Sequence, residues 1–63
     1  MNYFVKKKDE ETYQINNDRV VDQLNKETLE IGKKITVFGT VPHYLTVDDI
    51  KEDAIIFTDD LHS

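Results

Sequence analysis

The chain has 63 residues and a formal net charge of −5, and it contains neither cysteine nor tryptophan. The absence of thiols excludes disulfide bonds and thiolate zinc sites. We expect one small domain over residues 1–63 with a thin core, because a domain of this size buries only about 60% of the surface that its unfolded chain exposes. Such a core needs unusually good packing or the support of a partner.

Residues 35–41 carry the clearest secondary-structure signal, because their side chains alternate with the period of a β-strand. Val37 and Val41 lie in one row, and Phe38 lies in the opposite row. Proline has no backbone donor, so Pro42 is expected to end the strand.

Two other segments also predict strands. Residues 3–15 form a β-hairpin whose turn is a run of charged residues, with Tyr3 and Val5 on one face and Phe4 on the other. Residues 54–58 form a final strand that is covered on both faces, because its apolar run is unbroken.

Residues 17–30 predict an amphipathic helix. Asn17 can cap its first turn, and Gly32 suits the position just beyond its end. Its apolar stripe recurs at roughly 3.6 residues and consists of Val20, Val21, Leu24 and Ile31. This stripe is expected to pack on one row of the sheet, formed by Val5, Val37 and Val41.

A second, short helix is predicted at residues 47–52, since Thr46 and the acid three residues later resemble a capping box. The resulting fold is α+β, with the order β-β-α-β-(short α)-β and one mainly antiparallel four-stranded sheet. The alternative is an all-β barrel in which residues 19–21 form a strand. Residues 29–37 then resemble the segment leading into a barrel strand of SH3-like and OB-like folds.

Acidic residues concentrate in the last third of the chain and suggest a binding surface for a basic partner. They are Asp48, Asp49, Glu52, Asp53, Asp59 and Asp60. On a helix with a rise of about 1.5 Å per residue, the first four would approach the charge density of duplex DNA, which carries one charge per about 1.7 Å. The sharper hypothesis is therefore a DNA mimic, and the alternative is that these acids only keep the domain soluble.

A second candidate surface is the sheet face that a single helix cannot cover. Its predicted members are Phe4, Phe38 and Ile56, with the pair Ile55 and Phe57 as the alternative contribution of the last strand. We expect a protein partner or a second copy of the chain, as a homo-oligomer, to cover this face. In the alternative, residues 42–53 fold back over it.

The sequence argues against catalysis, cofactors and metal binding. The only serine, Ser63, lies in a tail at residues 59–63 that is expected to fray, and His43 is expected in a surface loop. The two glycines are isolated, so there is no phosphate-binding loop. Scattered basic residues argue against direct nucleic-acid binding, and the longest uncharged run is too short to cross a membrane.

These features predict a small, acidic, non-enzymatic protein-binding module of the cytoplasm. An inhibitor or regulator that covers the basic, nucleic-acid-binding surface of a host protein would fit. The many lysine, isoleucine and asparagine residues use AT-rich codons, which suggests a bacteriophage or mobile element as the source. Two alternatives stay open: an assembly subunit that oligomerises through its apolar face, and a small-barrel nucleic-acid-binding module.

Overall fold

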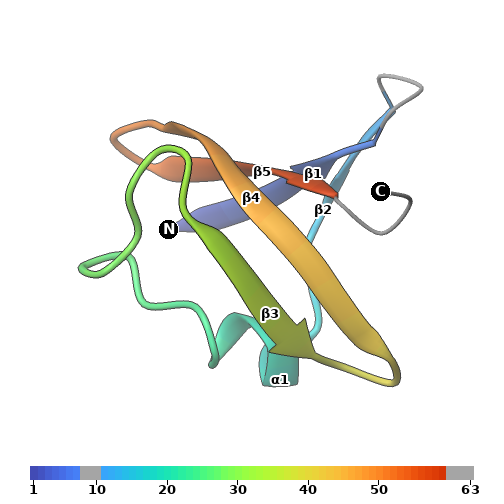
Figure 1. The fold of residues 1–63 in the computed structure, drawn as a ribbon. Helices are drawn as coiled ribbons and strands as arrows, with labels where there is room; N and C mark the ends of the chain where they lie inside the picture. Colours follow the sequence, from blue (N-terminus) through green and yellow to red (C-terminus); the bar gives the residue numbers. More distant parts are fainter. Residues whose placement is uncertain (8–10, 60–63) are drawn as a thin grey trace.

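The structure, a computed structural model, describes residues 1–7 and 11–59 (Figure 1). Within these two ranges, five strands form one sheet, and one short helix lies between the second and third strands. The elements are β1 (Asn2–Lys6), β2 (Thr12–Gln14), α1 (Asp18–Val21), β3 (Lys34–Phe38), β4 (Pro42–Ile50) and β5 (Ala54–Asp59). The chain is thus mainly β, which is compatible with the all-β alternative, and the predicted four-stranded sheet with a long helix is not confirmed.

The strands are ordered β2-β1-β5-β4-β3, so the last strand lies at the centre of the sheet (Figure 1). The predicted hairpin is confirmed, since β1 and β2 pair antiparallel with Phe4 opposite Gln14. The last strand is also confirmed as an interior strand, because it pairs with β1 on one side and β4 on the other. The β1–β5 pair is parallel, whereas the sequence predicted a mainly antiparallel sheet.

The helix predicted at residues 47–52 is wrong, because residues 42–50 form the long strand β4. The register shifts by one residue between Val47, which faces Phe57, and Asp49, which faces Ile56. Asp48 is therefore the extra residue of a β-bulge. The bulge restores the alternation that two consecutive aspartates would otherwise break, since it keeps Val47 on the core face and Asp49 off it.

The helix predicted over residues 17–30 is wrong beyond its first turn, because α1 ends at Val21. Its start is correct: the Asn17 side chain accepts hydrogen bonds from the backbone N–H groups of Arg19 and Val20 at 2.9 and 3.4 Å. The strand considered at residues 19–21 is wrong as well, since these residues lie in α1. Within the described ranges, no helix is long and apolar enough to cross a membrane.

The hydrophobic core lies between one face of the sheet, here called the inner face, and the connection from α1 to β3. Its main members are Tyr3, Val5, Val20, Leu24, Leu29, Val37, Leu45, Val47, Ile55 and Phe57. The prediction that Val41 and Ile31 belong to the core is wrong, because these side chains are 55% and 66% exposed, respectively. Val41 lies beyond the end of β3, and Leu29 is buried in place of Ile31 because the connection does not keep a helical period.

Gly32 makes the turn into β3, not the end of a helix. Its φ of +89° is in the left-handed region that favours glycine. Its N–H donates to the Val47 carbonyl at 2.8 Å, and the Val47 N–H donates to the Lys33 carbonyl at 2.9 Å. These two bonds tie the turn to β4 just before β3 begins.

Candidate functional site

The sheet face opposite the core, here called the outer face, carries the first candidate surface. The strand registers align one row across four strands of this face, which consists of Gln14, Phe4, Ile56 and Asp49. Phe4 and Ile56 are direct neighbours in this row, and both are half-buried. Ile55 and Phe57 face the core and are fully buried, so Ile56 is the residue that the last strand contributes to the outer face.

The structure does not bring Phe38 to this apolar pair. By alternation Phe38 belongs to the outer face, but it lies at the end of the edge strand β3, opposite Pro42. It is 56% exposed, and the nearest aromatic neighbour in the register is Tyr44, diagonally placed on β4. The predicted cluster is therefore two separate patches. The segment expected to fold back over this face is instead β4, a strand of the sheet itself.

The acidic residues separate in the same way. Four of them lie at the connection between β4 and β5, here called the acidic tip: Asp48, Asp49, Glu52 and Asp53. The tip is a strand end and a turn, closed by a hydrogen bond of 2.7 Å from the Lys51 N–H to the Ala54 carbonyl. Asp59 lies at the opposite end of β5, and Asp60 lies outside the described residues.

The geometry of the acidic tip removes the helical charge spacing on which the comparison with DNA depended. Residues in a strand rise by about 3.3 Å each, about twice the rise of a helix. Among the described residues, no group of three or more histidine, aspartate or glutamate side chains could hold a metal ion. The tip is a compact set of carboxylates at one end of the molecule.

The bulge joins the acidic tip to the apolar pair. Because Asp48 is the extra residue, Asp48 and Asp49 together oppose Ile56, whose other neighbour is Phe4. The sequence predictions did not include this junction. The two consecutive aspartates between Val47 and Ile50, which interrupt the alternation of apolar and polar residues, were the signal for it. The two predicted surfaces meet at this point.

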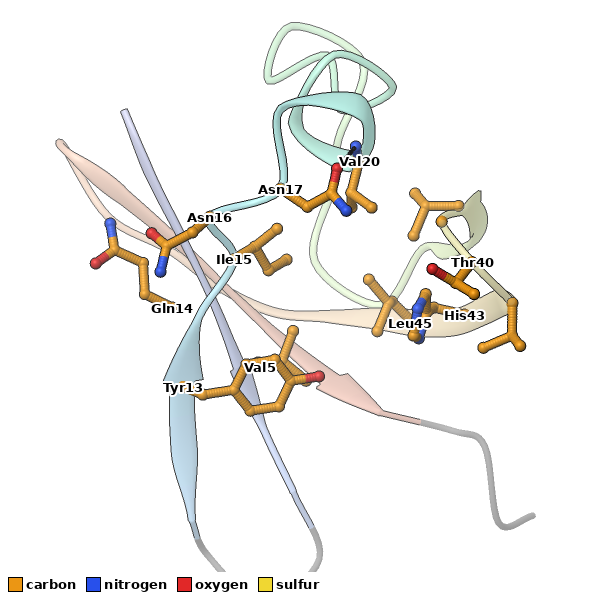
Figure 2. Close-up of a pocket in the computed structure, with 13 residues that line it drawn as sticks. Val5, Tyr13, Gln14, Ile15, Asn16, Asn17, Val20, Thr40, His43 and Leu45 are labelled. Atoms are coloured by element: carbon orange, nitrogen blue, oxygen red, sulfur yellow. Dashed lines mark hydrogen bonds between the residues drawn. The ribbon is translucent and has the colours of Figure 1, made fainter.

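A groove of about 310 Å³ lies on the inner side of the sheet (Figure 2). One side of the groove is formed by the end of β2 and the start of α1, and the other side by the turn from β3 to β4. Its lining includes Val5, Tyr13, Ile15, Val20, His43 and Leu45. Ile15 and Leu45 approach it from opposite sides in Figure 2. His43, expected in a loop, is half-buried in β4 opposite Val37.

The exposed edge of β3 is the third notable feature. The Gln23 side chain binds the backbone of Phe38 twice: the Phe38 N–H donates to Oε1 at 2.8 Å, and Nε2 donates to the Phe38 carbonyl at 2.7 Å. Nε2 also donates to the Arg19 carbonyl at 3.0 Å. Gln23 therefore takes the place that a residue of a neighbouring strand would occupy, and it ties the end of α1 to β3.

Replacing Gln23 by alanine is expected to lower the free energy of unfolding by about 1–2 kcal/mol, because two backbone hydrogen bonds at Phe38 are lost. Urea unfolding followed by circular dichroism measures this change. Gln14→Ala is the matched control, since the hydrogen bond from its side chain to Asn2 Oδ1 is long at 3.4 Å. Equal stabilities of the two variants would contradict the role assigned to Gln23.

Comparisons with protein-family models, curated proteins and solved structures give no match for this chain. Any function must therefore be inferred from the surfaces themselves.

Proposed function

We propose that the chain is a small, non-enzymatic protein-binding module of the cytoplasm. Its binding surface combines the acidic tip with the pair Phe4 and Ile56. The observation that carries this proposal is the row in which Phe4, Ile56 and Asp49 are successive register partners on the outer face. A partner that fits this surface presents an apolar side chain beside basic ones.

Charge and apolar surface have different roles in this proposal. The acidic tip carries four carboxylates and one lysine, Lys51, so it attracts basic groups and speeds encounter with a basic surface. The half-buried pair Phe4 and Ile56 supplies apolar contact next to it. Protein interfaces commonly combine an apolar centre with a polar rim. By covering a basic surface, the module would act as an inhibitor or regulator of its partner.

A charge-reversal experiment tests the proposal. Asp49, Glu52 and Asp53 are changed together to lysine, while Asp48 is kept so that the bulge is not altered. The control reverses three exposed acids of the α1–β3 connection, namely Asp22, Glu27 and Glu30. Each purified variant is immobilised and incubated with an extract of the source cell, and the bound proteins are identified.

The same protein is expected to bind the wild type and the control variant, and to be lost from the tip variant. Its binding should weaken as salt is added, because exposed charges more than about 10 Å apart are screened at 0.1 M ionic strength. Ile56→Thr should also weaken it, since a hydroxyl replaces part of the apolar contact. A partner that binds all variants equally, at every salt concentration, would exclude this surface.

A further inference from the structure

We propose that β3 accepts an extended segment of another protein as an additional strand. β3 is an edge of the sheet and pairs only with β4 among the described strands. An edge strand presents a row of backbone donors and acceptors, and extended peptides commonly bind such rows. This inference does not depend on the surface proposed above, which lies on β1, β4 and β5.

The hydrogen bonds of Gln23 show which backbone groups of β3 point outward. The N–H and C=O of Phe38 bind Gln23 and therefore point away from β4. In an antiparallel pair these directions alternate along the strand, so the backbone groups of Thr36 and Lys34 also point away from β4. Gln23 fills the edge at Phe38, and the stretch from Lys34 to Thr36 is left for a partner.

Exposed apolar side chains lie in β3, on its neighbour β4 and in the segments that flank β3. Of the large hydrophobic residues that the described ranges expose, Phe38 lies in β3, Tyr44 and Ile50 lie on the neighbouring β4, and Ile31 and Val41 lie in the segments before and after β3. Phe38 and Tyr44 are diagonal neighbours beside this edge, and adjoining exposed apolar groups mark interaction sites, whereas scattered ones do not.

Charge and register define the occupant. Lys33 and Lys34 are both exposed at the start of β3, in a chain whose net charge is −5. An extended segment with an acidic residue opposite Lys34 and apolar residues at the alternate positions complements this edge. A second copy fits less well: pairing centred on Thr36 would set Lys34 against Phe38, whose backbone Gln23 already binds in both copies.

The test uses a short capped peptide of alternating valine and glutamate, observed by NMR of the ¹⁵N-labelled chain. Binding is expected to shift the amide signals of Lys34 and Thr36 and to leave those of Phe4 and Ile56 in place. We expect the peptide to pair antiparallel with β3, so that the glutamate opposite Lys34 directs its N–H at β3. Methylating the glutamate amides should then abolish binding, and methylating the valine amides should not.

Three variants of the chain sharpen the test. Lys34→Glu should reverse the preference, so that a valine–lysine peptide binds about tenfold better than the glutamate peptide, and Lys51→Glu should change nothing. Thr36→Pro should abolish binding, since it removes an outward N–H that the sheet does not use. If the proline variant does not fold, the methylated peptides and Lys34→Glu still decide the question.

Several results would overturn the inference. Shifts confined to Phe4 and Ile56 would move binding to the other surface, and equal effects of the two methylations would exclude strand pairing. If no amide signal shifts when the peptide is added up to its solubility limit, strand pairing is excluded as well. Concentration-dependent dimerisation of the free chain, with the Thr36 amide protected from exchange, would assign the edge to a second copy. The lysine variant of Asp49, Glu52 and Asp53 should bind the peptide normally, which separates this inference from the proposed function.

Discussion

Phe57→Ala is expected to remove most of the free energy of unfolding of the domain. Phe57 is fully buried on the central strand, between Val5 on β1 and Val47 on β4, and its ring centroid lies 6.3 Å from that of Tyr3. Removing such a ring costs about 3–5 kcal/mol. At about 0.05–0.15 kcal/mol per residue, a chain of this length has a total stability of only roughly 3–9 kcal/mol. Thermal unfolding followed by circular dichroism measures the loss.

Phe38→Ala is the matched control for this prediction, because it removes the same side chain from an exposed position on β3. Its effect on the free energy of unfolding is expected to stay within about 0.5 kcal/mol, as for most surface substitutions. A similar loss for both variants would mean that Phe57 is not the centre of the core.

Deleting Thr46 is expected to be as damaging as Phe57→Ala. The deletion shifts Val47 to the outer face and turns Asp48 toward Phe57 on the inner face. A valine is then lost from the core and a carboxylate enters it, and burying an unpaired charge costs several kcal/mol. The variant should lack a cooperative unfolding transition in urea.

Deleting Asp48 instead should leave a folded domain. It removes the extra residue of the bulge and keeps Val47 opposite Phe57 and Asp49 opposite Ile56. The two deletions shorten β4 by the same amount, so chain length cannot explain a difference between them. If both variants unfold alike, or both stay folded, the position of the bulge is wrong.

Local alternation was sufficient to predict most strands of the sheet and the faces of several residues. In β1 it placed Tyr3 and Val5 on the core face and Phe4 on the other, and in β3 it placed Val37 inward. It failed at Val41, because Gly39, Thr40 and Val41 turn away after β3 ends. The parallel pairing of β1 with β5 has no local signal, since it joins residues at the two ends of the described chain.

The predicted long helix failed because tertiary packing overrode a helical pattern. Most helical stability in proteins comes from packing of an apolar face, and here Leu29 is buried in place of Ile31. Asn25 also favours a turn: its Oδ1 accepts from the Glu27 N–H at 3.0 Å, and its carbonyl accepts from the Thr28 N–H at 3.0 Å. Asparagine at this position is therefore a sequence signal against the helix.

The candidate site could be predicted only in part. Composition identified the acidic residues and alternation identified Phe4, while Ile56 was one of two alternatives for the last strand. Their junction depends on the bulge at Asp48, which is set by the register with β5. The edge formed by β3 could not be foreseen, because the strand order is a property of the whole sheet. Gln23 was read as a helix residue, and its bonds to Phe38 join segments that the sequence does not relate.

The central position of β5 has a consequence for how the chain folds. The β1–β2 hairpin and the β3–β4–β5 meander can each begin to pair locally, but the two units share a core only after Tyr3 meets Ile55. Closing so large a loop costs chain entropy before any contact repays it, and folds of this kind form slowly. Neither unit can bury its apolar face alone, so the domain gains its stability in one late, cooperative step.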